Sequence, residues 1–249
     1  MNRRLAPCFA LLAAVACGLF ASTAFAQGGI NLSWDECGSA GVLQKNFACD
    51  TNSGFAIMYG SVVTGHDMPM LNGHEGVIDM QTNVANLSDW WQLGTGGCRY
   101  NYIQENCNFV TFPAPACADP WLGVALSAMN YQAPFSGYPN RARIRTVCGN
   151  PEPIHADAST EYYLFTIWIG FARSTGLGSC AGCTDGACFV FASARVTQPS
   201  KLSSYLITSP QARSHVIWQP GGSEIGTRGC PGQLPARAPT WGQVKSLYR

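Results

Sequence analysis

Charged residues are scarce in this sequence: only 12% of its 249 residues are Asp, Glu, Lys or Arg. An ordinary soluble domain carries about twice that share. The 15 basic residues are offset by 14 acidic ones, so the chain has no basic excess for binding nucleic acid or an acidic membrane. Hydrophobic residues make up 47% of the chain, which argues against intrinsic disorder. The surface is therefore expected to consist mainly of uncharged polar residues and glycine.

The motifs of several enzyme classes are also missing. No Gly-x-Ser-x-Gly elbow, Ser-x-x-Lys pair or Gly-x-x-x-x-Gly-Lys loop occurs, so no catalytic residue or cofactor is assigned. His74-Glu75 lacks the second His of a zinc-protease helix, because residue 78 is Ile. A carboxylate pair across a cleft would suffice for a glycosidase, which leaves a secreted carboxylate- or metal-dependent hydrolase as an alternative. The scattered candidates are Glu36, Glu75, Asp119, Glu152, Glu161 and Glu224.

The N-terminal segment has the three parts of a secretory signal. Arg3-Arg4 precede an apolar run over residues 5–20, and Ala24-Phe25-Ala26 forms a small-residue cleavage site. We therefore predict a signal peptide over residues 1–26, and a protein that is secreted, periplasmic or at the cell surface. The alternative is a lipoprotein lipidated on Cys17, since Val15-Ala16-Cys17-Gly18 resembles a lipobox. No later segment reaches the roughly 18 apolar residues of a membrane helix.

Twelve cysteines become ten if Cys8 and Cys17 leave with the signal. In an exported chain they are expected to form disulfides. Proximity favours Cys37 with Cys49, one pair among Cys98, Cys107 and Cys117, and one within residues 180–188. The spacing Cys180-x-x-Cys183-x4-Cys188 also suits a zinc or redox loop, but no histidine lies nearby, so no metal is assigned. The ten candidates are Cys37, Cys49, Cys98, Cys107, Cys117, Cys148, Cys180, Cys183, Cys188 and Cys230.

Short apolar segments alternate with Gly, Pro, Asn and Ser clusters, which is typical of an all-β protein. We expect a disulfide-stabilised antiparallel β-sandwich, immunoglobulin-like or jelly-roll, as a single domain over residues 27–249. Tyr162–Ile169 is apolar at both parities, which predicts a central strand covered on both faces. The chain end, residues 240–249, is predicted to form a docked helical turn or strand. The expected strands are Phe55–Val63, Gly76–Thr82, Cys107–Phe112, Ala142–Val147, Tyr162–Phe171, Cys188–Thr197 and His215–Gln219.

Two groups of residues are candidates for ligand binding. Trp90, Trp91 and Trp121 would offer an aromatic platform for sugar rings, unless they belong to the core. Arg141, Arg143 and Arg145 alternate along a predicted strand, so they share one face. That face would either bind carboxylated or sulfated glycans or be a solvated surface whose positive charge is neutralised by acidic residues on the neighbouring strand.

Other polar residues have weaker patterns. The four histidines are interpreted as ordinary loop residues: His66, His74, His155 and His215. A calcium site built from Asp67, Asp79 or Asp89 is an alternative, although no D-x-D-x-D-G loop is present.

Several segments together resemble a group of exported bacterial proteins of unknown function, and the resemblance implies export but no activity. More loosely, the strand succession is similar to immunoglobulin-like or cohesin-like sandwiches. We therefore expect a non-catalytic module of the envelope or extracellular space, whose partner is a glycan or another envelope protein. A carbohydrate-binding module using the three tryptophans is the alternative. The segments of the resemblance are Leu32–Gly38, Phe47–Cys49, Trp90-Trp91, Asn140–Arg143, Glu161–Tyr163, Cys180–Cys183 and Trp241–Arg249.

Overall fold

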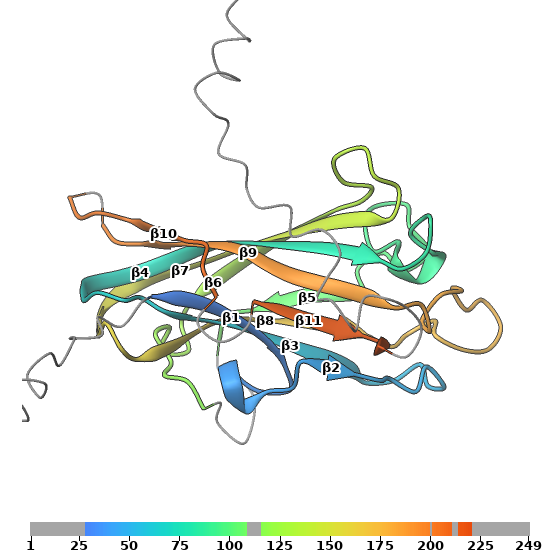
Figure 1. Cartoon of the computed structure of the whole chain (residues 1–249), viewed down its shortest axis with the longest axis horizontal. Coiled ribbons are helices and arrows are strands. Elements are labelled where there is room, and N and C mark those ends of the chain that lie inside the picture. The colour runs from blue at the N-terminus through green and yellow to red at the C-terminus, as the bar shows by residue number, and fades with distance from the viewer. Residues whose placement is uncertain (1–27, 109–115, 200, 211–213, 221–249) are drawn as a thin grey trace, which may run out of the picture.

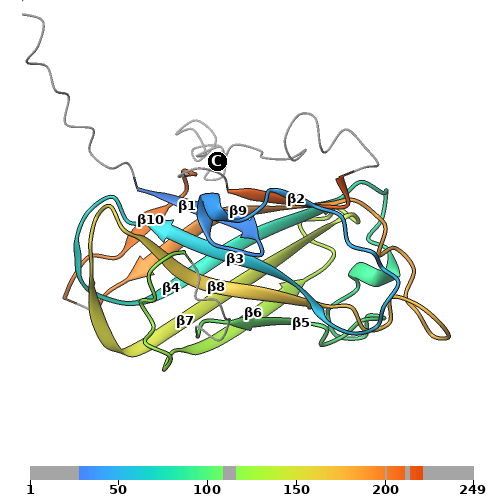
Figure 2. The same ribbon diagram turned by 90° about the horizontal axis from the view of Figure 1, so that it is seen from below.

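The computed structural model describes residues 28–108, 116–199, 201–210 and 214–220. These residues form two β-sheets that lie face to face as a sandwich (Figures 1 and 2). The predicted all-β, disulfide-stabilised sandwich is therefore confirmed. The predicted signal peptide, Cys230, Glu224 and the chain end at residues 240–249 lie outside the described residues.

The smaller sheet has four strands and the larger has seven. The smaller sheet has the order β1 (Gly29–Trp34), β3 (Phe55–Val63), β8 (Glu161–Gly170) and β5 (Ile103–Asn106). The larger has β2 (Gln44–Lys45), β11 (His215–Trp218), β9 (Ala187–Thr197), β4 (Met68–Thr82), β7 (Arg141–Ala156) and β6 (Leu126–Gln132), with β10 (Tyr205–Ile207) pairing to β9. All pairings are antiparallel except that of β2 with β11.

The helical elements of the described residues are two short 3-10 turns. They are η1 (Gly38–Ala40) and η2 (Asp89–Trp91). Within the described ranges, no helix has the length and apolar character needed to cross a membrane.

Six of the seven predicted strands are confirmed. The prediction for Cys107–Phe112 is wrong at its start, because β5 ends at Asn106, and residues 109–112 lie outside the described part. The strand stops there because the side-chain oxygen of Asn106 accepts a 2.8 Å hydrogen bond from the backbone N–H of Asn108, a local turn that competes with pairing.

The core lies between the two sheets, and β8 runs through its centre as expected. β8 lies between β3 and β5, and nearly all of its residues are buried. Phe165 reaches into the core, where its ring lies 5.3 Å from that of Phe191 on the opposite sheet. Gly60 on β3 is needed beside it, because a β-carbon at residue 60 would collide with the Phe165 ring.

Aromatic rings fill one end of the core around Trp218 of β11. Its ring centroid lies 3.9 Å from Phe47, 4.9 Å from Trp90 and 5.3 Å from Trp91. Trp34 of β1 approaches the same ring at 6.0 Å. Burial of large aromatic rings supplies much of the apolar area that stabilises a domain, so this cluster is a main source of stability.

Disulfides join parts of the chain that are far apart in sequence, so the predicted short-range pairings are wrong. The bonds are Cys37–Cys117, Cys49–Cys183, Cys98–Cys180 and Cys107–Cys148, with separations of 80, 134, 82 and 41 residues. The physical reason is that sandwich topology places distant strands and loops side by side. Cys188 is also disulfide-bonded.

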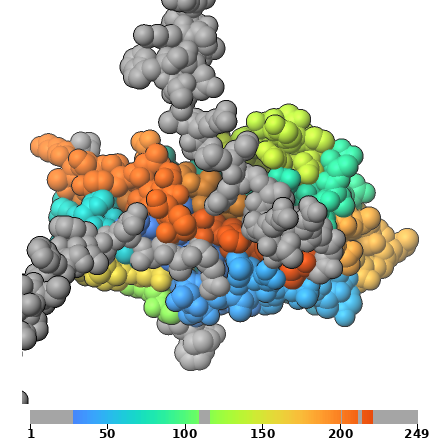
Figure 3. Space-filling view, viewed as in Figure 1, coloured from blue at the N-terminus to red at the C-terminus, as the bar shows by residue number. Residues whose placement is uncertain are grey.

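Two of these bonds hold the segment between β8 and β9, which projects at one end of the molecule (Figure 3). Cys180 and Cys183 belong to this segment, and each is bonded to a different distant cysteine. Neither is therefore a free thiolate. The disulfides expected for the cysteines of the Cys180–Cys188 loop are therefore present.

Candidate functional site

The three tryptophans predicted as a sugar platform are wrongly assigned. Trp90, Trp91 and Trp121 are all 0% exposed. The indole N–H of Trp121 donates a 2.9 Å hydrogen bond to the backbone oxygen of Leu164, and that of Trp90 donates to Ser174 at 3.1 Å. Rings enclosed in this way cannot stack on a ligand at the surface.

The three arginines do share one face of β7, the outer face of the larger sheet. Ala142, Ile144 and Thr146, which alternate with them, are fully buried. Arg143 forms a two-pronged ion pair with Asp79 of β4, with nitrogen–oxygen distances of 2.7 and 2.9 Å. The acidic neighbour expected on the next strand is therefore present.

The arginines differ in how fully they are engaged. Arg141 donates a 3.0 Å hydrogen bond to Gln81 and lies 4.2 Å from the centroid of the Tyr138 ring. Arg143 lies 3.9 Å above the ring of Phe135. Arg145 is exposed, and among the described residues no ion pair to it is present. It is therefore the arginine of this face that is available to an external anion.

A polar pocket of about 390 Å³ adjoins this face. It lies between β6 and the loop that follows η2, and its lining contains no charged side chain. Asn130 of β6 lines it and is the cross-strand neighbour of Arg145. Gly97 allows the loop after η2 to approach the backbone of Gln92, because a β-carbon at residue 97 would collide with the backbone oxygen of Gln92. The lining residues are Gln92, Gly94, Thr95, Gly97, Asn130, Tyr131, Gln132 and Ala133.

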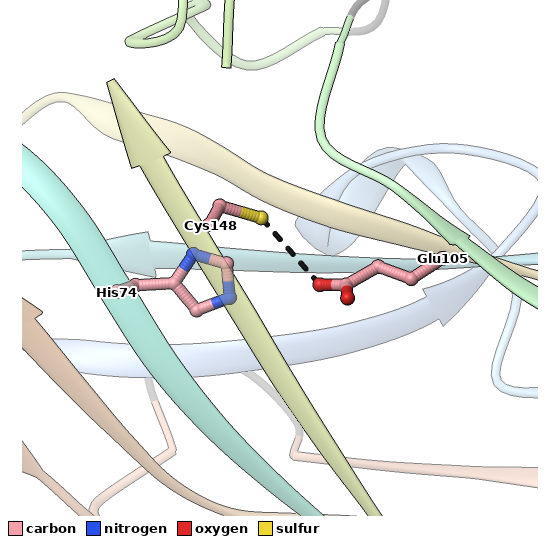
Figure 4. Close-up of side chains that lie close together, drawn as sticks. All are labelled: His74, Glu105 and Cys148. Carbon is pink, nitrogen blue, oxygen red and sulfur yellow. Dashed lines mark hydrogen bonds between the residues drawn. The ribbon is translucent and has the colours of Figure 1, made fainter. Parts of the chain in front are cut away.

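A second candidate site lies inside the sandwich, where three strands each deliver one donor side chain (Figure 4). His74 comes from β4, Glu105 from β5 and Cys148 from β7, and one ligand atom of each lies within 4.8 Å of the others. The Glu105 carboxyl oxygen Oε1 lies 3.5 Å from Cys148 Sγ and 3.6 Å from Cys107 Sγ. We call these four residues the donor cluster.

Burial keeps the two titratable groups of the donor cluster uncharged at neutral pH. Desolvation lowers the pKa of His74 to about 3. It raises the pKa of Glu105 to about 9, although a backbone hydrogen bond from Val147 opposes the shift. The ring nitrogen Nε2 of His74 lies 3.3 Å from the hydroxyl of Thr146, which is itself fully buried.

Three of the four residues of the donor cluster are almost fully buried, and Glu105 is partly buried. His74 is 1% exposed, Cys148 2% and Cys107 0%. The sulfur of Cys148 is bonded to Cys107, so it cannot also act as a thiolate ligand or nucleophile. The geometry therefore supports no reaction at this point while the disulfide is intact.

The other polar candidates are separated from one another. Within the described ranges, His74, Glu105 and Cys148 are the one group of three metal-ligating side chains that converge, and none of Asp67, Asp79 and Asp89 belongs to such a group. The interpretation as loop residues is wrong for His74, His155 and His215, which lie in β4, β7 and β11, and the side chain of His74 lies in the core. Glu75 lies on the opposite, outer face and faces Arg195 at 3.8 Å, as the alternation of a strand requires.

The chain has no significant match among protein-family models or curated proteins.

Proposed function

We propose that this protein is a non-catalytic, exported β-sandwich that serves as a structural or binding module in the cell envelope or outside the cell. The observation that carries the proposal is a division within the molecule. In the donor cluster, His74 is buried and Glu105 is partly buried beside a disulfide, whereas the outer face of the larger sheet presents polar groups to solvent.

The disulfides support the proposed location. Nine cysteines lie in the described part of the chain, and all of them are disulfide-bonded. Such bonds persist in oxidising compartments and are rare in the cytosol. The expected signal over residues 1–26 agrees with this location.

The outer face supports binding to an anionic glycan. Arg145 offers an exposed guanidinium, whose planar donors suit a carboxylate or sulfate. Asn130, beside it, lines the uncharged polar pocket, and amides recognise sugar hydroxyls by donating and accepting hydrogen bonds. A neighbouring guanidinium and amide-lined pocket thus match the two chemistries of an acidic sugar.

Affinity electrophoresis tests the glycan proposal. The disulfide-intact protein is run through native gels that contain either a neutral polysaccharide or one with carboxylate or sulfate groups. We expect retardation by the acidic polymer, and loss of most of it in Arg145→Ala. Arg195→Ala is the matched control, because Arg195 lies on the same face but is opposed by Glu75. Equal loss in both variants, or no retardation by any polymer, would contradict the binding site.

Export is tested separately. The protein is produced through an oxidising compartment and alkylated without reduction, and its intact mass is measured. A chain that begins at Gln27 and carries no alkyl group is the expected result. Free thiols at Cys180, Cys183 or Cys188 would contradict the structural interpretation of that loop.

A further inference from the structure

The donor cluster has the composition of a metal site, although two of its members are joined as a disulfide. It holds one imidazole, one carboxyl and two sulfurs, on β4, β7, β5 and the residue that follows β5. A set of imidazole and sulfur donors suits Zn²⁺ and excludes hard cations such as Mg²⁺. Its residues come from both sheets, so a bound ion would link the two layers of the sandwich.

The distances from Glu105 to the two sulfurs are close to those of a tetrahedral site, and the sulfurs would separate from each other once their bond is broken. Ligands held about 2.0 to 2.3 Å from Zn²⁺ lie roughly 3.3 to 3.8 Å from one another. The oxygen of Glu105 already lies 3.5 and 3.6 Å from the two sulfurs. His74 lies within 4.8 Å of Glu105 and Cys148, so a shift of about 1 Å would bring its nitrogen into the same range.

A second observation points to a ligand. His74 is 1% exposed, yet its ring nitrogen Nδ1 has no hydrogen-bond partner, and the same holds for Oε2 of Glu105. A buried polar atom without a partner destabilises the fold by about 1 to 3 kcal/mol. Both atoms belong to side chains that converge on one point (Figure 4). A cation at that point would give these side chains a partner.

We propose that reduction of the Cys107–Cys148 disulfide converts the donor cluster into a four-ligand site for Zn²⁺. The reductant is a dithiol: it delivers two electrons and two protons, the sulfur–sulfur bond breaks to give two thiols, and the dithiol is oxidised to its own disulfide. Binding of Zn²⁺ then displaces one proton from each thiol and one from the Glu105 carboxyl. His74 coordinates through a lone pair of its neutral ring.

The proposal implies two alternative cross-links between the two sheets, a disulfide and a metal ion. In the oxidised protein the disulfide connects β7 with the chain just after β5. In the reduced protein the ion would connect β4, β5 and β7, and would thereby hold the two sheets together before the disulfide forms. The proposed zinc site shares no residue with the proposed glycan-binding site at Arg145 and the polar pocket.

The sharpest test frees one sulfur without reducing the protein. Cys107→Ala leaves the Cys148 thiol beside His74 and Glu105, while the other disulfides stay intact. We expect this variant to bind one equivalent of Co²⁺, used as a spectroscopic substitute for Zn²⁺, with a thiolate-to-cobalt charge-transfer band. Adding Glu105→Gln or His74→Gln should weaken binding by about tenfold or more, as expected for loss of a direct ligand.

Cys98→Ala is the matched control. It frees Cys180, which belongs to no group of converging donors among the described residues, so it should bind no Co²⁺. The proposal is wrong if the folded Cys107→Ala variant takes up no more Co²⁺ than this control. It is equally wrong if Glu105→Gln and His74→Gln leave the affinity unchanged.

A second measurement covers the case in which Cys107→Ala does not fold. The unaltered protein is reduced under native conditions, freed of dithiol by gel filtration, supplied with Zn²⁺ and then alkylated. We expect Zn²⁺ to protect Cys107 and Cys148 from alkylation in preference to the other cysteines. Equal labelling of all cysteines with and without Zn²⁺ would overturn the proposal.

Discussion

Replacing Glu105 by Gln should change how the stability of the oxidised protein depends on pH. The pKa of this carboxyl rises from its ordinary value of 4.5 to about 9 in the folded protein, because burial penalises the charged form. A group with a raised folded-state pKa stabilises the fold fully below its unfolded pKa, and this contribution is lost as pH rises toward the folded pKa. The contribution of Glu105 to stability should therefore fall between pH 4.5 and 9.

The titration of His74 limits the pH range in which the effect of Glu105 on stability can be measured alone. Its pKa is lowered from 6.5 to about 3, so its contribution is complete above pH 6.5 and is lost as pH falls below that value. Between pH 4.5 and 6.5 the two contributions oppose each other. Above pH 6.5 the contribution of His74 is constant, whereas that of Glu105 still falls by about 1.4 kcal/mol for each pH unit. Over two units the loss is about 2 to 3 kcal/mol, with residual hydration of this partly buried carboxyl favouring the lower figure.

Urea unfolding with the disulfides intact measures this effect at about pH 6.5 and about pH 8.5. The unaltered protein should lose about 2 to 3 kcal/mol between the two conditions, and Glu105→Gln should lose less than about 1 kcal/mol. Glu75→Gln serves as a control, because Glu75 is exposed and its substitution should leave the dependence on pH unchanged. A flat profile for the unaltered protein, or an undiminished one for Glu105→Gln, would refute the reasoning.

Three further substitutions test the packing, each by the free energy of unfolding in urea. Gly60→Ala should cost about 1 to 3 kcal/mol, because its β-carbon would collide with the Phe165 ring; no loss would mean that the ring can move. Arg99→Met removes hydrogen bonds to three backbone carbonyl oxygens and should cost about 3 kcal/mol or more. Cys98→Ala with Cys180→Ala should lower stability by about 2 to 4 kcal/mol and leave the circular dichroism of the sheets unchanged, whereas loss of the sheets would show that this bond is required for folding.

The strands that could be predicted from the sequence have a strong pattern of burial. In β7, buried Ala142, Ile144 and Thr146 alternate with the three arginines, and β8 is apolar at both parities. β6 (Leu126–Gln132) gave no such signal, because it lies at the edge of its sheet and most of its side chains are exposed. Periodicity therefore identifies strands that cover the core and misses edge strands.

The assignment of Trp90 and Trp91 failed because their local structure was unknown. The sequence left both an aromatic platform at the surface and a place in the core open for these rings. Both residues instead lie in the 3-10 turn η2, and their rings pack 4.6 Å apart, centroid to centroid, inside the molecule. The disulfide pairings failed for a related reason, since spacing along the chain carries no information about which loops the sandwich brings together.

The donor cluster was only partly accessible to sequence reasoning. His74 continues the inward-facing parity of Ile78 and Met80, so a longer strand would have placed it in the core. Cys148 likewise follows Ile144 on the buried face of β7. No such pattern exists for Glu105, because β5 has four residues and belongs to the other sheet. Glu105 comes near His74 and Cys148 only when the two sheets pack together. The pattern along single strands therefore shows two inward-facing polar residues but not the cluster that they form with Glu105.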